Sequence, residues 1–314
     1  MIYIYKILRK VFFFIKRFKP SYFFYKYFFG GAIRKINGYK MHLDLKNDNG
    51  ISQELFKYRR REHFSTDFVI NSKIIKRGDV VLDLGANIGY YALIESGLVG
   101  DNGMVYAIEP VSGNFNNLEK NIRLNNIENI KTFRLAVGDQ NKDIDIHIHE
   151  KGNWSSILPQ KGKEYLSSEK ISMVKVDDFV KAKNIKPSLV RMDVEGYEYA
   201  FLRGMKSIIE NYSPQLLIEI HPHILSLKEK LEICDILKNN YSKATVIRDP
   251  NSQYMNLRNQ LNPILLFLSK KIGDYTDLNS DNLIPFGKQE VDIETLFRYI
   301  KDSKFAFHAF IFKE

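Results

Sequence analysis

Two acidic residues and a glycine-rich turn follow one another closely in the sequence. The stretch VVLDLGANIGYYALI starts at Val80, and its apolar run reaches Asp83 shortly before Gly85 and Gly89. Glycine at such a turn lets the chain reverse and lets a ligand approach the backbone N–H groups. The next apolar run ends in Glu109, and an acid at that point can accept hydrogen bonds from both hydroxyls of a ribose. The order of strand, turn, helix, strand and acid therefore predicts a site for an adenosine-containing ligand.

The residues of the turn distinguish between such ligands. Dinucleotide sites carry Gly-x-Gly-x-x-Gly because a pyrophosphate sits against the helix N-terminus. This chain instead has Gly85-Ala86-Asn87-Ile88-Gly89, with Asp83 just before it. A carboxylate there repels a pyrophosphate but suits a ligand with a sulfonium and an α-amino group. The turn thus favours S-adenosylmethionine over a nicotinamide cofactor.

Further polar residues follow the fourth and fifth strands that the sequence predicts. Asp193 and Glu195 come after the fourth, and Glu219 and His221 come at the end of the fifth. Transfer of a methyl group from a sulfonium to an alcohol needs in-line alignment and a general base. Because like charges raise a carboxyl pKa, we predict that Glu195 or His221 is the base and that Asp193 orients acceptor or cofactor.

The same residues allow other interpretations. Asp193, Glu219 and His221 could ligate Mg²⁺, because oxygen ligands at adjacent strand ends can converge on one ion. His221 precedes Pro222, so it could simply end a strand, and Asp193 could have a buried structural role. Glu198 is expected to be a carboxylate at a helix N-terminus, where it favours the helix dipole.

Alternating strand and helix signals must position these residues. We expect strands at residues 80–84, 104–109, 130–137, 188–193, 215–220, 241–248 and 305–312. Helices are expected to start near residue 89 and to cover 112–125, 200–211, 227–239 and 293–300. The pattern predicts an α/β fold: a Rossmann-like, seven-stranded, mainly parallel sheet with helices on both faces.

Additional segments surround this core. Residues 32–36 and 39–45 are predicted to form a hairpin through Asn37-Gly38, and residues 51–75 a helix. Residues 143–149 and 171–176 indicate a half-exposed strand pair. We expect three parts, which are a basic aromatic extension with the hairpin (1–48), the cofactor-binding core (49–248), and a C-terminal insertion with the final strand (249–314).

Composition sets limits on the class of protein. Hydrophobic residues make up 44% and charged residues 27% of the 314, as in ordinary folded domains. The single cysteine, Cys234, excludes an intramolecular disulfide and a multi-cysteine zinc site. The net charge is +10, which would favour acidic partners. Much of this excess lies in the first forty residues, so nucleic acid is not the expected partner.

The first forty residues contain many Lys and Arg residues, many aromatic residues and no acid. Their apolar runs are interrupted before they reach the roughly twenty residues that span a bilayer, and no secretory cleavage pattern is clear. We therefore expect a cytoplasmic protein. Residues 1–30 are expected either to contact an anionic membrane from its surface or to form a helix that covers one face of the sheet.

Several motifs together resemble the FkbM-type methyltransferases, which are class I S-adenosylmethionine-dependent enzymes. They are VLDLGANIGYY from Val81, AIEP from Ala107, LAVG from Leu135, RMDVEGYE from Arg191 and IEIH from Ile218. The resemblance covers about residues 50–223 and follows the family's order.

The resemblance implies roles for individual residues. Asp83, Gly85, Ala86, Asn87 and Gly89 would hold the methionine moiety, Glu109 the ribose, and Ala136 or its neighbours the adenine. The methyl group would go to oxygen, on a hydroxyl of a sugar, a glycan or lipid-linked saccharide, or a secondary metabolite. The alternatives are a methyltransferase acting on nitrogen or RNA, although an Asn/Asp-Pro-Pro-Tyr/Phe motif is absent after the fourth strand, and a non-catalytic adenosyl-binding scaffold.

Overall fold

The computed structural model describes residues 22–48, 50–149, 157, 165–194, 196–249, 284 and 287–313. The predicted base Glu195, residues 1–21 and residues 250–283 lie outside the described residues.

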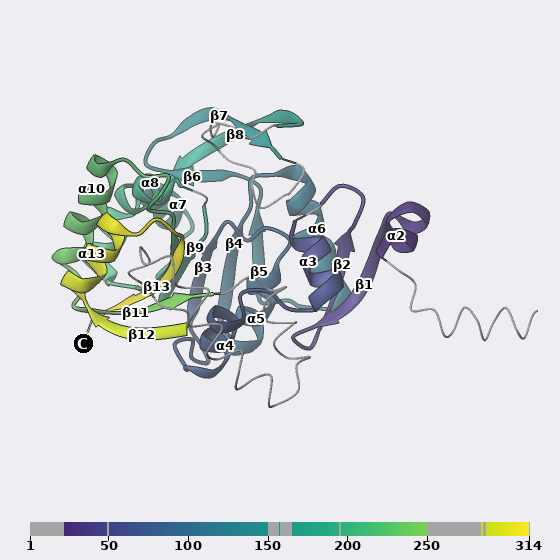
Figure 1. The fold of residues 1–314 in the computed structure, drawn as a ribbon, viewed down its shortest axis with the longest axis horizontal. Coiled ribbons are helices and arrows are strands. Elements are labelled where there is room, and N and C mark those ends of the chain that lie inside the picture. Colours follow the sequence, from purple (N-terminus) through teal and green to yellow (C-terminus); the bar gives the residue numbers. More distant parts are fainter. Residues whose placement is uncertain are drawn as a thin grey trace, which may run out of the picture.

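The centre of the structure is an eight-stranded sheet with the order β12-β11-β13-β10-β9-β3-β4-β5 (Figure 1). The strands are β3 (Val80–Leu84), β4 (Met104–Ile108), β5 (Ile130–Phe133), β9 (Leu189–Met192), β10 (Gln215–Ile220), β11 (Lys243–Arg248), β12 (Gly287–Asp292) and β13 (Phe307–Phe312). The pairs β3–β4, β4–β5, β3–β9 and β9–β10 are parallel, whereas β13 runs antiparallel between β10 and β11. The mainly parallel α/β prediction is confirmed.

The sheet has eight strands and not the predicted seven. The additional strand, β12, pairs antiparallel with β11 at the edge of the sheet. Its sequence, GKQEVD, is largely exposed and buries only Val291. An edge strand needs few apolar residues, so its hydrophobic pattern gave no signal for a strand.

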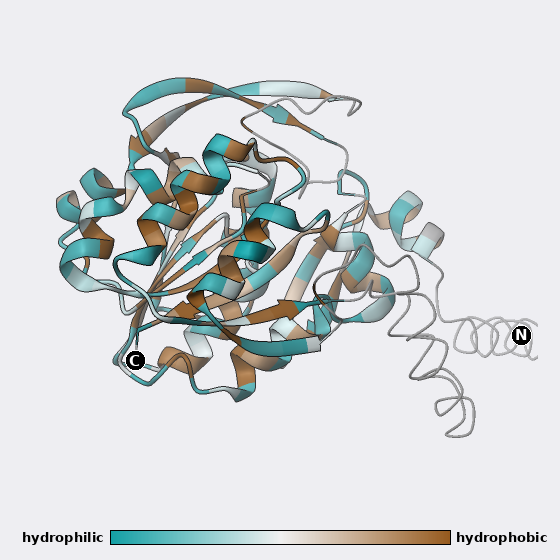
Figure 2. Ribbon diagram, turned by 60° about the vertical axis from the view of Figure 1, so that its left-hand side comes forward, coloured by the Kyte–Doolittle hydropathy of each residue, from teal (hydrophilic) through white to brown (hydrophobic). Residues whose placement is uncertain are grey.

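Helices cover both faces of the sheet. One face packs against α3 (Ile51–Tyr58), α4 (His63–Asn71), α5 (Tyr90–Val99) and α6 (Ser112–Leu124). The other packs against α7 (Val176–Ala182), α8 (Glu198–Gly204), α9 (Lys206–Tyr212), α10 (Leu227–Lys238) and α13 (Ile293–Asp302). Figure 2 shows the hydrophobic residues gathered on the strands and on the inward sides of these helices.

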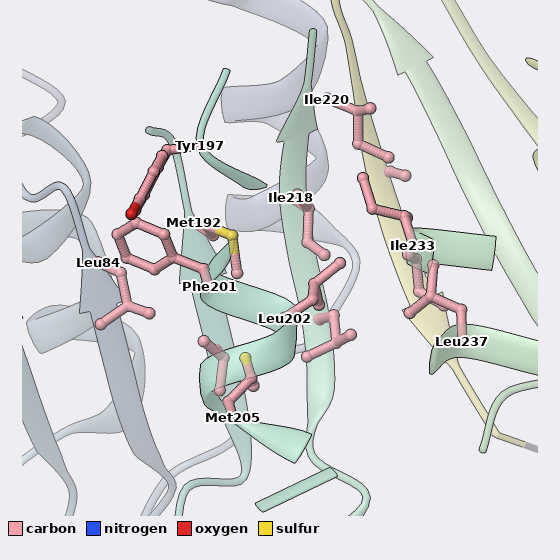
Figure 3. Close-up of a cluster of buried hydrophobic side chains, with 14 of the residues drawn as sticks. Leu84, Met192, Tyr197, Phe201, Leu202, Met205, Ile218, Ile220, Ile233 and Leu237 are labelled. Atoms are coloured by element: carbon pink, nitrogen blue, oxygen red, sulfur yellow. The ribbon is translucent and has the colours of Figure 1, made fainter. Parts of the chain in front are cut away.

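The face beneath α8 and α10 is closed by a tightly packed apolar layer. Leu84, Met192 and Ile218, from three neighbouring strands, meet Phe201 and Leu202 of α8 (Figure 3). All five side chains are buried. This apolar layer fixes α8 against the three strands.

Three predicted elements are each split in two. Residues 51–75 form α3 and α4, because Arg59 and Glu62 take the left-handed conformation with φ of 59° and 44°. Residues 200–211 lie in α8 and α9, which meet at Met205. Neither break contains a proline, and glycine occurs only at Gly204 beside the second one, which ends α8. Neither break is therefore marked by a strong local signal.

The predicted third strand, residues 130–137, also divides. Its first part is β5, and its second part is β6 (Ala136–Gly138), which leaves the main sheet. There β6 joins β7 (Lys142–Ile148) and β8 (Ser167–Lys175) in a separate three-stranded sheet. The expected strand pair is confirmed as the antiparallel β7–β8 pair.

The N-terminal hairpin is also as predicted. Strands β1 (Gly31–Ile36) and β2 (Tyr39–Asp44) pair antiparallel. The two turn residues, Asn37 and Gly38, have positive φ angles of 48° and 92°, as a two-residue type I′ turn requires. Before the hairpin come the short helix α2 (Tyr22–Phe24) and the π-helical turn η1 (Tyr25–Phe29). No helix among the described residues is long and apolar enough to cross a membrane.

Candidate active site

Strand register gathers polar side chains on the α4–α5 face of the sheet. Asp83 lies beside Arg191, Arg191 lies beside Leu217, and Glu219 lies opposite His308. Alternate residues of a strand face the same side, so this register puts Asp83, Arg191, Glu219 and His308 on one face. Each of them lies at or toward the carboxyl edge of the parallel strands, where open α/β sheets bind ligands.

The predicted glycine turn connects β3 to α5 and has the geometry that only glycine adopts easily. Gly85 and Gly89 have φ of 85° and 89°. A Cβ on Gly85 would collide with the backbone carbonyl of Asp193, and one on Gly89 would come within 2.7 Å of the Leu118 side chain. Asn87 has a φ of 52°, and its side chain accepts a hydrogen bond from the N–H group of Ile88. The turn therefore needs its glycines for both conformation and space.

Glu109 lies directly after β4 and binds the glycine turn. Its carboxylate accepts hydrogen bonds from the backbone N–H of Asn87 at 2.9 Å and of Val111 at 3.0 Å. The side-chain amide of Asn114 adds a third donor at 3.2 Å. Burial raises the pKa of Glu109 to about 7, although these three donors oppose the shift. The two predicted parts of the cofactor site are thus in direct contact.

Asp83 has a partner that the sequence analysis missed. Its side chain is fully buried, and its Oδ1 atom lies 2.9 Å from Nη1 of Arg191. Its Oδ2 atom has no hydrogen-bond partner among the described residues. Burial raises the pKa of Asp83, and the charge of Arg191 opposes this shift. The only sequence signal for the pair was an arginine inside the apolar strand LVRM.

Arg191 connects Asp83 to the acceptor side of the site. Its other nitrogen, Nη2, lies 3.4 Å from Oδ2 of Asp193, and its guanidinium lies 4.0 Å from the ring centroid of Tyr91. Burial, together with the neighbouring carboxylate of Glu219, raises the pKa of Asp193 to about 6. A carboxyl pKa raised toward neutrality in this way is typical of functional sites.

Ala136 lies apart from the main sheet, as the first residue of β6. Its side chain is buried, and it pairs with Met173 of β8. The three-stranded sheet therefore carries the residue that the resemblance assigns to adenine.

His221 forms a dyad with Glu198. Nδ1 of His221 lies 2.7 Å from Oε1 of Glu198, and the same oxygen accepts the N–H group of Gly196 at 3.0 Å. Both side chains are buried. Nε2 of His221 lies 3.8 Å from Oε1 of Glu219. Glu198 is the first residue of α8, as predicted. Its carboxylate, however, contacts the imidazole of His221.

Residues of the α4 segment complete this side of the site. Oε2 of Glu62 accepts a hydrogen bond from the hydroxyl of Tyr91 at 2.8 Å and lies 3.4 Å from Nε2 of His308. Arg61 forms an ion pair with the other oxygen of Glu62. Sequence reasoning missed these residues because they come from a break between helices and from the last strand. No local motif marks either place.

The carboxylates and imidazoles converge in a different way from the predicted Mg²⁺ set. Among the described residues, the group whose ligand atoms all lie within 4.8 Å of one another is Glu62, Glu219 and His308. Of the predicted ligands it includes Glu219 but not Asp193 or His221. The imidazole of His221 is instead held by Glu198.

Comparisons with known proteins place the chain in a family. Residues 83–243, just over half of the chain, match the methyltransferase FkbM domain. The hexuronic acid methyltransferase AglP of Haloferax volcanii is 28% identical over 147 residues, which are 46% of this chain and 56% of that protein. The chain thus matches only about half the length of this relative.

Solved structures with a similar fold are more distant. The methyltransferase FkbM of Methylobacillus flagellatus is 20% identical, with a TM-score of 0.41 over 55% of this chain and 41% of that chain. The fibrillarin of Aeropyrum pernix, solved with S-adenosyl-L-methionine, is 15% identical, with a TM-score of 0.35 over 68% and 73%. Neither is close enough to inform the chemistry of this chain. The family match itself contains the glycine turn, Glu109, Asp193 and His221, so the chain belongs to the FkbM methyltransferase family.

Proposed function

We propose that the protein is an O-methyltransferase that methylates a hydroxyl of a sugar, free or within a glycan or lipid-linked saccharide. The observation that carries this proposal is the His221–Glu198 dyad, at 2.7 Å, which follows β10 at the same edge of the sheet as the glycine turn. An orienting carboxylate behind an imidazole is the arrangement of an activated general base. An alcohol needs such a base before it can attack a methyl carbon.

The residues of the turn fit the cofactor. The position that a Cβ of Gly85 would fill is bounded by the backbone of Asp193, so the turn and the end of β9 form one wall. In the proposal, residues 85–89 bind the methionine moiety, Glu109 accepts hydrogen bonds from the ribose, and Ala136 packs against the adenine. S-adenosylmethionine, when bound, supplies an electrophilic methyl group on sulfur.

Asp83 acts in this proposal through Arg191. Because the arginine neutralises its charge, Asp83 fixes the guanidinium between the cofactor side and Asp193.

The acid–base step assigns a separate role to each nitrogen of His221. In the proposal, Glu198 accepts a hydrogen bond from Nδ1–H of the neutral imidazole, which puts the lone pair on Nε2. Nε2 would take the proton of the acceptor hydroxyl as its oxygen displaces sulfur from the methyl carbon, the sulfur leaving with the C–S electron pair, and Asp193 would orient the acceptor or the amino group of the cofactor. Glu195, which is outside the described residues, remains the alternative base.

The acceptor side favours a polyhydroxylated molecule. Carboxylates and imidazoles from three strands and from the α4 segment face this region, and each can bind a hydroxyl. These are Asp193, Glu219, His308 and Glu62. The name of the Haloferax relative, hexuronic acid methyltransferase, points to the same class of acceptor.

The proposal is tested by incubating the purified protein with methyl-labelled S-adenosylmethionine and separate panels of sugar nucleotides, saccharide lipids, amines and RNA. We expect label on a saccharide, and NMR of the product should show an O-methyl ether. Label on nitrogen or RNA alone would contradict the proposal. Cofactor binding without transfer to any panel would instead favour the adenosyl-binding scaffold.

We also propose that residues 1–30 contact an anionic membrane from its surface. The described end of this segment exposes aromatic rings, with Tyr27 and Phe28 each 75% and Phe29 67% accessible. Basic residues lie beside them in the sequence, among them Lys26, and aromatic and basic side chains together suit a lipid interface. Sedimentation with anionic liposomes should fall when residues 1–30 are deleted, and unchanged sedimentation would contradict the membrane contact.

A further inference from the structure

A second polar cluster lies beside the proposed acid–base groups and takes no proton in the proposed step. It consists of Glu62, Glu219 and His308. Nε2 of His308 lies 3.4 Å from Oε2 of Glu62 and 3.8 Å from Oε2 of Glu219. Glu219 and His308 are direct partners across the β10–β13 pair, so register alone holds two of the three groups together.

Nε2 of His308 faces the two carboxylates of this cluster as an ion-pair partner of both. Its side chain is only 5% exposed, and Nε2 has no hydrogen-bond partner among the described residues. Both separations from the carboxylates exceed the usual length of an N–H···O bond, about 2.9–3.0 Å. They are close to the ligand–ligand separations of roughly 3.0–3.4 Å that follow from metal bonds of about 2.1 Å.

Glu62 is brought to the cluster against its backbone preference. It occupies the N-cap position of α4 with φ 44° and ψ 63°, a left-handed conformation that is costly for a side chain larger than glycine. Its carboxylate does not cap the helix. Asp249 does so instead, through the backbone N–H groups of Phe64 and Ser65. The Glu62 carboxylate is therefore free to face the sheet.

The two carboxylate oxygens of Glu62 have different partners. Arg61 pairs with Oε1, and the hydroxyl of Tyr91 donates to Oε2, the oxygen nearest His308. Such outer partners are typical of metal-binding carboxylates, which are themselves fixed by hydrogen bonds. The ion pair with the arginine is thus made by the oxygen that is not the one nearest the imidazole.

We propose that Glu62, Glu219 and His308 bind one divalent first-row transition metal ion, with Mn²⁺ and Zn²⁺ as the best matches. Two carboxylates and one imidazole are a mixed oxygen and nitrogen donor set, which suits these ions better than Mg²⁺. Three protein ligands leave coordination positions open for water or for an acceptor hydroxyl. Binding of the ion does not depend on the proposed sugar substrate or on the His221 dyad.

The test uses the full chain, stripped with a chelator and titrated with Co²⁺, whose visible absorption reports coordination by protein ligands. We expect one Co²⁺ per chain, displaced by Zn²⁺ or Mn²⁺. Glu219→Gln and His308→Gln should each weaken binding roughly 10- to 100-fold or more, as loss of metal-site groups does. The control is His147→Gln, in β7 and away from the cluster, which should bind Co²⁺ as the unmodified chain does.

Several outcomes decide the proposal. Absence of a saturable cobalt band in the unmodified chain overturns it, and so does binding that both ligand variants retain at full strength. Should His308→Gln not fold, as judged by circular dichroism, Glu62→Gln and Glu219→Gln supply the same comparison. The titration needs neither S-adenosylmethionine nor an acceptor, so its failure would leave the proposed methyl transfer untouched, and failure of methyl transfer would leave the metal site untouched.

Discussion

The two halves of the carboxyl edge are built by different means. On the cofactor side, the turn after β3 presents a backbone N–H group to Glu109, and the hydrogen-bond partners of this acid among the described residues all lie within residues 87–114. On the acceptor side, side chains converge from distant parts of the chain, such as Glu62 of the α4 segment and His308 of the last strand. The first half is a local structure, and the second exists only once the whole sheet is assembled.

This difference has consequences for what each half can tolerate. A site made of backbone is sensitive to space and conformation, and a site made of buried charges is sensitive to the loss of any one partner. Substitutions on the cofactor half should therefore act through steric clash and backbone strain. Substitutions on the acceptor half should act through the loss of a charged partner.

The largest expected effect concerns the acceptor half. His221→Gln should lower kcat by roughly 10²- to 10⁴-fold, because general-base catalysis contributes about that much. Affinity for S-adenosylmethionine should stay the same, since no cofactor contact is assigned to His221. Calorimetry for the cofactor and single-turnover methylation for the rate separate the two quantities. A full rate in this variant would indicate that Glu195, and not His221, is the general base.

Glu198→Gln supplies the matched comparison for that variant. Gln keeps the shape of the side chain but removes the negative charge that holds the imidazole through Nδ1. The rate should fall less than in His221→Gln, and its pH profile should shift to lower pH because the imidazolium loses a stabilising charge. An unchanged pH profile would contradict the proposed dyad.

A second effect concerns the buried ion pair between the halves. Arg191→Met should destabilise the fold by about 3–5 kcal/mol, because it leaves the carboxylate of Asp83 buried without its counter-charge. Denaturant unfolding measures the loss. The double variant Arg191→Met with Asp83→Asn should recover much of it, since neither charge is then left alone. If the double variant were no more stable than Arg191→Met, the pair would not act as a unit.

The sequence predicted the cofactor half better than the acceptor half for a physical reason. The glycine turn and the acid after β4 are separated by a short stretch, and each leaves a mark in the local pattern. The partner of Asp83 lies on a strand much later in the chain, and the cluster around His308 requires β13 to enter between β10 and β11. Register across such distances is set by packing of the whole sheet, which a local hydrophobic pattern does not encode.

The breaks in the helices show the same limit. Glu62 lies at the interruption between α3 and α4, and neither glycine nor proline marks it. The conformation follows from contacts made by Glu62 with Tyr91 and Arg61. The sequence alone therefore predicted the fold class and the geometry of the glycine turn but not the positions of Glu62 and His308.

A smaller effect tests the claim that the cofactor half depends on space. Gly85→Ala should weaken binding of S-adenosylmethionine roughly tenfold or more, because the left-handed conformation costs about 1–2 kcal/mol for alanine and the methyl group meets the carbonyl of Asp193. The control is Gly38→Ala in the hairpin, where φ is 92° and no heavy atom lies within 4 Å of the new Cβ. Calorimetry should show near-normal cofactor affinity for the control, and equal affinities in the two variants would contradict the spatial argument.

The smallest expected effect is a pH dependence of cofactor affinity that belongs to Glu109. Burial raises the pKa of this carboxyl to about 7, and only the ionised form accepts hydrogen bonds from both ribose hydroxyls. Affinity for S-adenosylmethionine should therefore rise as pH increases from 6 to 8, with a slope of at most about tenfold per pH unit below the pKa. In Glu109→Gln, the neutral amide should bind more weakly at pH 8 and show a flat profile between these limits. Calorimetry across this range with both proteins makes the comparison, and a slope that survives the substitution would assign the titrating group to another residue, of which Asp193, with its pKa near 6, is the first to examine.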